Sequence, residues 1–485
     1  MSIKNERNIR FSVFVLGFTT IITQIILLRH FLMIFRGNEL VIGIILANWM
    51  LLTALGAYIG PKVNQYRNKT LLFVTAHVLI GILPLLMSLA IFYFRNTVFP
   101  PGKMINLIEI YIGSLFLLLP FCVATGAMFT IFSSHLSGLF KSDKISEVYS
   151  IEAIGSIAGG LLFNFLFIFV FSSFLTLKIL LVLNLTAAIF ISFGFHSSTT
   201  PRIFGLLAIA FSGFIMTLDF NHAAFEKLFI NQHLIKIKDT PYGNIVVTET
   251  GGQYNFYENG TPLFSTDDVI SNEENVHYAM LQHPSPENIL LISGGISGTI
   301  EEILKYKVSS IDYLELDPAL VKLGNKYSLN TAKYKKVQVI NQDARLFLKK
   351  TNKEYDVVLI NLPDPYGAQI NRYYTIEFFE ELKQRCSGSA VIAISLSSSA
   401  NYMNEVDLQI HRSLFSTLKF MFENVIIIPG LRNYFIASDG NVQSTIGELT
   451  TLKGISNTYV NKYYLDDKLM PNAKRKSLKK SGMKS

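Results

Sequence analysis

Four groups of glycine or polar residues follow short apolar segments in the second half of the chain. The first is the glycine-rich run Ser293–Gly298, which comes directly before a helix-like segment. Glycine lets a backbone approach a ligand closely, and the amino terminus of a helix offers free N–H groups. The glycines Gly294, Gly295 and Gly298 are therefore candidate ligand-binding residues, although a tight turn would explain the same run.

Carboxylates and an amide follow the next three apolar segments. Glu315 lies about 20 positions after the glycine run, where an acidic side chain can accept hydrogen bonds from both hydroxyls of a ribose. Asp343 is suited to receive hydrogen bonds from an exocyclic amine. Asn361 and Asp364 lie together in the run Asn361–Pro365. Together the four groups predict a nucleoside site without specifying the nucleoside.

A scaffold must bring these residues together at one edge of a sheet. Residues 235–250 and 254–266 are typical of β-hairpins, with turns at Pro241–Asn244 and Asn259-Gly260. Beyond them, short apolar strands alternate with helical segments, which predicts a doubly wound α/β sheet with ligands at the carboxyl ends of its strands. We expect strands at 289–293, 311–315, 337–340, 356–360, 390–395 and 424–428, and helices at 299–306, 318–327, 375–385 and 404–421.

The segments around these positions resemble the core motifs of spermidine synthases and related aminopropyltransferases. The resemblance covers about residues 235–440, and the amino-terminal half is similar to a membrane-embedded branch in which a hydrophobic bundle is fused to the synthase domain. It implies a Rossmann-like, methyltransferase-type α/β domain and a possible homo-oligomer. The motifs that carry it are Leu291–Glu302, Tyr313–Pro318, Asn341–Leu348, Tyr355–Phe379, Arg36–Glu39, Tyr149–Ser156 and Asn371–Thr375.

The resemblance implies that decarboxylated S-adenosylmethionine donates an aminopropyl group to an amine such as putrescine, with no permanently bound cofactor and no metal. Such a reaction needs orientation and a deprotonated amine. By this resemblance Glu315 would hold the ribose, and Asp343, with Ala344 beside it, would hold the adenine. Asp364 would be the second aspartate of the catalytic loop and Tyr374 the aromatic residue after it.

Several positions depart from the family pattern, and they gather on the amine side. Ile296 replaces an aspartate that grips the donor ammonium, and Asn361 replaces the first catalytic aspartate. An isoleucine cannot neutralise an ammonium, and an amide cannot act as a base near neutral pH. Tyr278-Ala279 replaces a histidine-glutamate pair. We therefore expect the adenosine half of the pocket to be intact and the amine half to be degenerate.

Three functions are compatible with this pattern. The first is a membrane-tethered aminopropyltransferase with an altered acceptor, in which Asp364 is the main acid–base or orienting group. The second is methyl transfer from intact S-adenosylmethionine, a donor that is easier to reconcile with Ile296. The third is a non-catalytic, nucleoside-sensing domain that regulates a transport-like membrane bundle.

The first part of the chain has the composition of a membrane protein. Residues 1–220 hold 14 Lys and Arg and 7 Asp and Glu, whereas the remaining 265 residues hold 57 of the 78 charged residues. The positive charge lies in loops between apolar segments, so we expect a lipid bilayer and not nucleic acid as partner.

We expect a bundle over 1–220, an α/β domain over 235–440 and a basic extension over 441–485. A bilayer core needs about 20 apolar residues per helix, which predicts about seven spans, at 10–34, 39–60, 71–94, 106–136, 148–172, 174–195 and 202–218.

The loop charges predict a cytoplasmic amino terminus, because one set of flanks carries nine Lys and Arg and the other carries five. Seven spans would then place the soluble domain outside the cytoplasm, yet adenosyl co-substrates are made inside the cell. The stretch 106–136, which contains Pro120, is a candidate broken or re-entrant segment. We expect a multi-pass protein of the cell (inner) membrane with a cytoplasmic soluble domain.

Polar and small residues within the spans suggest contacts between helices. Arg29 is expected to pair with Glu39 or Glu152, or else to reach the membrane surface at the end of its span. Gly155 and Gly159 have the spacing of closely packed membrane helices.

Some residues of the soluble part have simpler explanations than ligand binding. His277 and His283 have no metal-ligand partner at a useful spacing, so we expect solvated or hydrogen-bonded side chains. Ser395–Ser399 is expected to be a polar loop. Tyr373 and Tyr374 are compatible with core packing or with an aromatic lid, and their position after the catalytic-type loop favours the lid.

Overall fold

The structure is a computed structural model that describes residues 3–35, 39–66, 68–98, 105–195, 200–398 and 404–464. Contacts divide the chain into two units. One consists of Met1–Glu249 with Tyr257–Thr261, and the other of Thr250–Phe256 with Pro262–Ser485. The basic tail and the stretch 36–38 of the predicted motifs lie outside the described residues.

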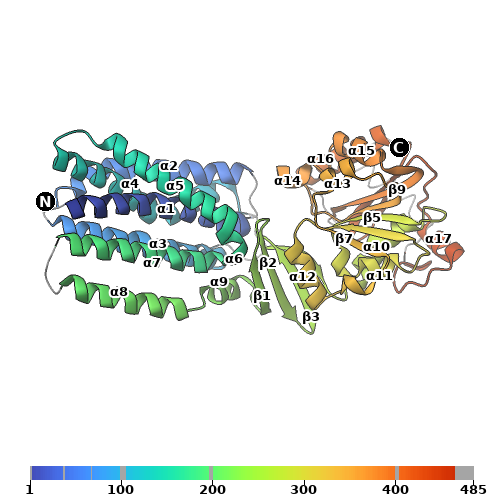
Figure 1. Cartoon of the computed structure of the whole chain (residues 1–485). Coiled ribbons are helices and arrows are strands. Elements are labelled where there is room, and N and C mark those ends of the chain that lie inside the picture. Colours follow the sequence, from blue (N-terminus) through green and yellow to red (C-terminus); the bar gives the residue numbers. More distant parts are fainter. Residues whose placement is uncertain are drawn as a thin grey trace. The chain divides into compact units, whose positions relative to one another are not determined.

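The first unit contains a bundle of long apolar helices (Figure 1). Within the described ranges, six stretches are 21 to 34 residues long with a mean hydropathy of 2.1 to 2.3, which is long and apolar enough to cross a membrane. They coincide with the first six predicted spans. The helices are α1 (Ile3–Phe35), α2 (Glu39–Val63), α3 (Lys69–Val98), α4 (Leu107–Phe140), α5 (Ile145–Leu162), continued by a π-helical turn (Phe163–Phe167) and α6 (Ile168–Val170), and α7 (Ser173–Phe195).

The seventh predicted span, 202–218, corresponds to α8 (Thr200–Thr217). The axes of α8 and α9 (Phe220–Leu228) meet at 44°, and counting this bent pair as one span gives up to seven. The expected break within 106–136 is wrong, because α4 runs continuously through Pro120. Membrane helices tolerate proline where neighbouring groups satisfy the freed carbonyl.

Glycine allows α1 and α5 to pack closely. A Cβ atom added at Gly155 would lie 2.2 Å from the carbonyl oxygen of Phe14, and one at Gly159 would lie 2.9 Å from that of Phe18. Gly160 has more room, with its nearest neighbour at 4.0 Å. The predicted close packing is confirmed at Gly155 and Gly159.

Four strands follow the helices and form a sheet in the order β1-β2-β3-β4. β1 and β2 are antiparallel, and the turn between β3 and β4 has positive φ angles at Asn259 (49°) and Gly260 (72°), as tight hairpins require. Both predicted hairpins are confirmed. The strands are β1 (His233–Asp239), β2 (Asn244–Thr250), β3 (Gln253–Glu258) and β4 (Thr261–Ser265).

Arg29 joins the carboxyl end of α1 to the first hairpin. Its guanidinium donates hydrogen bonds to the carbonyl oxygens of Thr240 at 2.7 Å and Gly243 at 3.0 Å. Glu152 instead lies beside Ser156, with 3.4 Å between their side-chain oxygens, so the expected pair of Arg29 with Glu152 is not formed. The amino terminus of α1 lies at the opposite end of the bundle from this hairpin (Figure 1).

The second unit is a doubly wound α/β domain with helices on both faces of its sheet (Figure 1). Among the described residues the sheet has seven strands, in the order β10-β11-β9-β8-β5-β6-β7. The strands are β5 (Asn288–Ile292), β6 (Ser310–Leu314), β7 (Val337–Ile340), β8 (Tyr355–Ile360), β9 (Cys386–Ser397), β10 (Asn424–Pro429) and β11 (Arg432–Ser438). The helices are α10 (Val269–Met280), α11 (Thr299–Ile303), α12 (Pro318–Tyr327), α13 (Ala344–Lys350), α14 (Ala368–Asn371), α15 (Ile376–Lys383), α16 (Glu405–Met421) and α17 (Ile446–Lys453).

The strand order places a switch point in the middle of the sheet. From β5 the chain moves outward to β6 and β7, then returns to the other side of β5 with β8 and β9; these five strands run parallel. Ligands of such sheets bind beside the carboxyl ends of the strands at the switch. All six predicted strands are present as β5 to β10, whereas β11, antiparallel to both β9 and β10, was not predicted.

Candidate active site

The glycine run follows β5 at the switch point. Ser293, Gly294 and Gly298 have φ angles of 63°, 77° and 116°, a region that favours glycine. A Cβ atom at Gly294 would lie 3.0 Å from the side chain of Asn361, and one at Gly295 would lie 2.8 Å from the ring of Tyr313. The glycine run is therefore a compact turn that lies between Asn361, in the loop after β8, and the buried ring of Tyr313.

Ile296 points away from this turn. Its side chain is 1% exposed and packs against α12, where it would lie 2.5 Å from a Cβ atom added at Gly324. The position where the family pattern has an aspartate therefore belongs to the hydrophobic core and offers no charge to a ligand.

Glu315 follows β6 and lies beside the glycine run. Its Oε2 accepts hydrogen bonds from the hydroxyls of Ser293 at 3.1 Å and Tyr313 at 3.0 Å, and the residue is 6% exposed. Burial raises the pKa of Glu315 to about 7, although the two hydroxyls oppose the shift. The predicted ribose-binding carboxylate therefore adjoins the glycine run, and its charge changes near neutral pH.

Asp343 follows β7 and is occupied by neighbouring groups. Its Oδ1 accepts from the N–H of Leu346 and so caps α13, which begins at Ala344. Its Oδ2 accepts from Arg372 and from the hydroxyl of Tyr373. Burial raises the pKa of Asp343, but these hydrogen bonds outweigh it and hold the pKa below its ordinary value. An adenine amine at this position would share the carboxylate with two donors that the sequence did not predict.

The loop after β8 contains the predicted catalytic residues. The N–H of Asn361 donates to the carbonyl of Ile292 at 2.9 Å, which holds this loop against the end of β5. The side-chain Nδ2 of Asn361 is buried and has no hydrogen-bond partner among the described residues. Asp364 forms an ion pair with Arg432 at 2.5 Å. The structure therefore brings Asn361 beside the glycine run and gives Asp364 a cationic partner from β11.

The expectation of an aromatic lid is wrong. Tyr373 and Tyr374 are 6% and 7% exposed and belong to the core that also contains Phe378. The Tyr374 hydroxyl donates to the carbonyl of Pro363 at 3.0 Å. Both rings are buried in this core, and Tyr374 supports the loop from within the core through its bond to Pro363.

The serines at the end of β9 are more than a polar loop. Ser395 and Ser397 lie within the strand and accept hydrogen bonds from Arg432 at 2.9 Å and 3.0 Å. Ser399 lies outside the described residues. Arg432 could not be recognised from the sequence, because the strand that it begins was not predicted.

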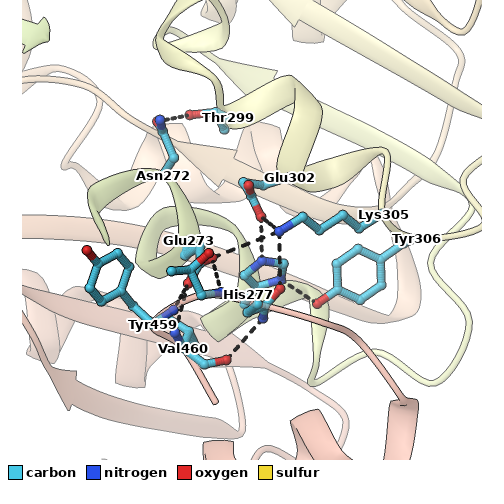
Figure 2. A network of polar contacts seen from close by, with 11 residues as sticks. Asn272, Glu273, His277, Thr299, Glu302, Lys305, Tyr306, Tyr459 and Val460 are labelled. Atoms are coloured by element: carbon cyan, nitrogen blue, oxygen red, sulfur yellow. Dashed lines mark hydrogen bonds and ion pairs between the residues drawn. The ribbon is translucent and has the colours of Figure 1, made fainter. Parts of the chain in front are cut away.

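A second polar cluster lies at α10, which was not predicted as a helix (Figure 2). Glu273 is fully buried and accepts from the backbone N–H groups of Thr458, Tyr459 and Val460 at 2.7 to 2.8 Å. These three donors fix the segment after α17 to α10. The neighbouring Glu274 accepts from the N–H of Leu431 at 2.9 Å, which ties the turn before Arg432 to the same helix.

The histidines have hydrogen-bond partners. His277, also buried, contacts the Tyr306 hydroxyl and Glu302, each at 2.8 Å (Figure 2), and His283 lies 3.3 Å from the hydroxyl of Ser389. The expectation of hydrogen-bonded histidines is confirmed.

The switch point, the glycine run and the buried carboxylate define a doubly wound α/β domain with a candidate nucleoside site. Residues 269–439 match the family described as the spermine/spermidine synthase domain. The α/β domain of this chain is therefore similar to the spermine/spermidine synthase domain over these residues.

Three proteins with similar sequences share the name polyamine aminopropyltransferase. A polyamine aminopropyltransferase of Oceanobacillus iheyensis is 29% identical over 353 residues, 69% of this chain and 66% of the relative. One of Leptospira interrogans is 30% identical over 268 residues, 52% of this chain and 54% of the relative. Polyamine aminopropyltransferase 2 of Aquifex aeolicus is 25% identical over 439 residues, 87% of this chain and 85% of the relative. The chain thus spans about half to two thirds of the first two relatives, and the third match is long enough to include much of the helical unit.

Two solved structures are also similar. A spermidine synthase in complex with the transition-state analogue AdoDATO has 20% sequence identity and a TM-score of 0.45. The spermidine synthase from Thermotoga maritima has 19% identity and a TM-score of 0.44. Each comparison covers 51% of this chain and 88% of the other.

Proposed function

We propose that this chain is a membrane-bound transferase that moves an aminopropyl group from decarboxylated S-adenosylmethionine to a polyamine or a related amine, through a site whose amine half is degenerate. The observation that carries the proposal is the buried Glu315 carboxylate beside the glycine run, 3.1 Å from Ser293, at the switch point of a spermidine synthase-type domain. The names of the three relatives support the same reaction class.

In this reaction the acceptor nitrogen attacks the carbon beside the sulfonium. A C–N bond forms, the C–S bond breaks, methylthioadenosine leaves and the nitrogen loses a proton. The sulfonium is already a good leaving group, so the protein must mainly orient the two partners and accept the proton. We assign ribose binding to Glu315, close approach of the donor to Gly294 and Gly295, and orientation of the acceptor to the loop that holds Asn361 and Asp364.

The membrane part of the proposal rests on the six apolar helices. Many large apolar side chains of the bundle are exposed, for example Met50 at 72% and Phe165 at 77%, which suits contact with lipid. We place the α/β domain in the cytoplasm because its donor is made there. If α1 is a complete span, the amino terminus and the first hairpin lie on opposite sides of the membrane. A cytoplasmic α/β domain then puts the amino terminus outside the cytoplasm, whereas the Lys and Arg counts of the loops predict a cytoplasmic amino terminus. Reporters fused to each end, one active only inside the cell and one only outside, decide between the two placements.

Two alternatives have one supporting observation each. A nucleoside-sensing domain without catalysis is favoured by the ion pair that already engages Asp364. Methyl transfer from intact S-adenosylmethionine is favoured by the buried Ile296, because no carboxylate stands there for a lone donor ammonium.

The test is a binding titration on the full-length protein in detergent. Calorimetry would measure the binding of methylthioadenosine, S-adenosylmethionine and its decarboxylated form to the wild type, to Glu315→Gln and to a matched control, Glu301→Gln. The Glu301 carboxylate accepts a hydrogen bond from the Tyr334 hydroxyl at the surface. We expect micromolar binding that Glu315→Gln weakens and Glu301→Gln retains, with preference for the decarboxylated donor. Preference for the intact donor would favour methyl transfer. No binding by folded protein would refute both enzyme functions.

A further inference from the structure

The carboxylate of Asp364 is engaged by the protein itself on both oxygens. Its Oδ1 accepts from Nη2 of Arg432 at 2.5 Å and from the N–H of Ser397 at 3.1 Å. Its Oδ2 lies 3.3 Å from the same N–H and 3.4 Å from the hydroxyl of Tyr366. The Asp364 side chain is 8% exposed and that of Arg432 is 32% exposed, so the guanidinium of Arg432 is the counter-charge of a mostly buried carboxylate.

Arg432 is held in a fixed position by β9. Its Nε donates to the Ser395 hydroxyl at 2.9 Å, its Nη1 to the Ser397 hydroxyl at 3.0 Å, and its Nη2 also to the Ser395 carbonyl at 3.3 Å. Arg432 opens β11 and pairs with Ser397 across the antiparallel strands. The planar guanidinium is therefore oriented by two strands.

The two loops at the switch point provide no other negative charge to this pair, and the further carboxylate near Tyr366 and His411 is that of Asp407 on α16. The runs 293–298 and 361–365 contain one carboxylate between them, that of Asp364. Ile296 is buried in the core, and Asn361 carries an uncharged amide that lies 3.0 Å from the Cβ position of Gly294. Asp364 and Arg432 therefore neutralise each other, and the two loops together with Arg432 have a net charge of zero.

A diamine carries two ammonium groups into the site, and each needs a counter-charge once water is removed. The Asp364 carboxylate can neutralise one cation, and Arg432 already supplies that cation. We propose that Arg432 is a specificity-determining residue whose guanidinium takes the place of an acceptor ammonium on Asp364. It excludes small diamines, so it narrows the acceptor of the proposed function from a polyamine to a related amine that carries no second cationic group. This inference rests on the proposed function, because it assumes that Asp364 faces the acceptor.

The experiment measures putrescine and butylamine binding by calorimetry to full-length protein in detergent, saturated with methylthioadenosine. The proteins are the wild type, Arg432→Gln and the double variant Arg432→Gln/Asp364→Asn. Glutamine can still bond the two serines but leaves Asp364 without its cation, so we expect Arg432→Gln to bind putrescine about tenfold more tightly than the wild type. The double variant should lose that gain. The matched control Lys383→Gln breaks another cation–carboxylate pair, with Asp439 at 2.7 Å, and should bind putrescine like the wild type.

Two results would overturn the inference. One is an Arg432→Gln protein that binds methylthioadenosine normally and gains no affinity for putrescine. The other needs no variant: the wild type should prefer butylamine, which has one ammonium, and a preference for putrescine contradicts the proposal even if Arg432→Gln fails to fold. Failure of the proposed function is a separate result, because the wild type would then not bind methylthioadenosine.

Discussion

The hydroxyl of Tyr313 donates a hydrogen bond of 3.0 Å to the carboxylate of Glu315 at the buried end of β6. Burial raises the pKa of Glu315 to about 7 despite this bond. The group that we assign to the ribose therefore gains or loses its charge within the physiological pH range.

Nucleoside binding should depend on pH. A ribose diol donates hydrogen bonds to the ionised carboxylate, so binding selects deprotonated Glu315 and releases a proton. With a pKa of about 7, the affinity for methylthioadenosine should rise about tenfold between pH 6 and pH 8. Calorimetry in two buffers of different ionisation enthalpy measures both the affinity and the released proton. An affinity that does not change with pH would remove Glu315 from the ribose site.

Glu315 should also lower the stability of the folded protein at high pH. Its pKa rises from a model-compound value of 4.5 to about 7 on folding. The folded state therefore keeps a proton that the unfolded state has lost, and stability falls as pH rises through this window. The full loss is at most about 3 kcal/mol. Glu315→Gln cannot ionise, so its melting temperature in detergent should exceed that of the wild type at pH 8 and approach it at pH 5.

Gly294→Ala should weaken both stability and nucleoside binding. The residue has a φ of 77°, and its new Cβ would lie 3.0 Å from Asn361. We expect a loss of about 1–2 kcal/mol in stability. The control is Gly388→Ala, because a Cβ at Gly388 meets nothing within 4 Å. Equal melting temperatures for the two variants would show that the turn tolerates a side chain.

Gly155→Ala should separate α1 from α5. The added Cβ would lie 2.2 Å from the Phe14 carbonyl oxygen, and backbone cannot yield as a flexible side chain does. We expect a cost of about 1–3 kcal/mol, seen as a lower melting temperature of the full-length protein in detergent. Gly160→Ala lies on the same helix with its nearest neighbour at 4.0 Å and should have little effect.

Glu273→Gln should release the segment after α17. An amide has one acceptor oxygen in place of two, so at least one of the N–H groups of Thr458, Tyr459 and Val460 loses its partner. Val460 is the buried residue of the three, and an unsatisfied buried donor costs about 1–3 kcal/mol. Hydrogen exchange followed by mass spectrometry should show faster exchange at residues 458–460 in the variant. Glu301→Gln should leave this segment protected.

Local patterns in the sequence predicted most of the fold. Strands β5 to β10 and both hairpins follow from apolar runs bounded by turn residues, and Gly155 and Gly159 follow from their spacing. Strand β11 escaped prediction because Arg432 and Asn433 give it a polar start and because its pairing with β9 joins residues at least 35 positions apart in the chain. The break expected at Pro120 was wrong because a proline signal is local, whereas the helix is maintained by its packing neighbours.

The candidate site shows the same limit. Glu315 and the glycine run could be predicted because a strand and a helix start place them at one sheet edge. The partners of the acidic residues could not: Arg432 is 68 positions from Asp364, and Arg372 is 29 positions from Asp343. Which cation meets which carboxylate depends on the three-dimensional order of the strands, and no spacing rule encodes it.

The placement of β11 between β9 and β10 has a consequence for biogenesis. A ribosome makes the apolar helices first, and the α/β sheet can be completed only after residue 438 has emerged. Until then β9 presents an open edge, the kind of surface on which unfinished chains aggregate. The contact between Glu273 and Val460 spans 187 residues and must form later still. A chain that is cut before residue 438 would thus keep its apolar helices but lack a finished sheet, which makes completion of β11 a natural checkpoint for proteases.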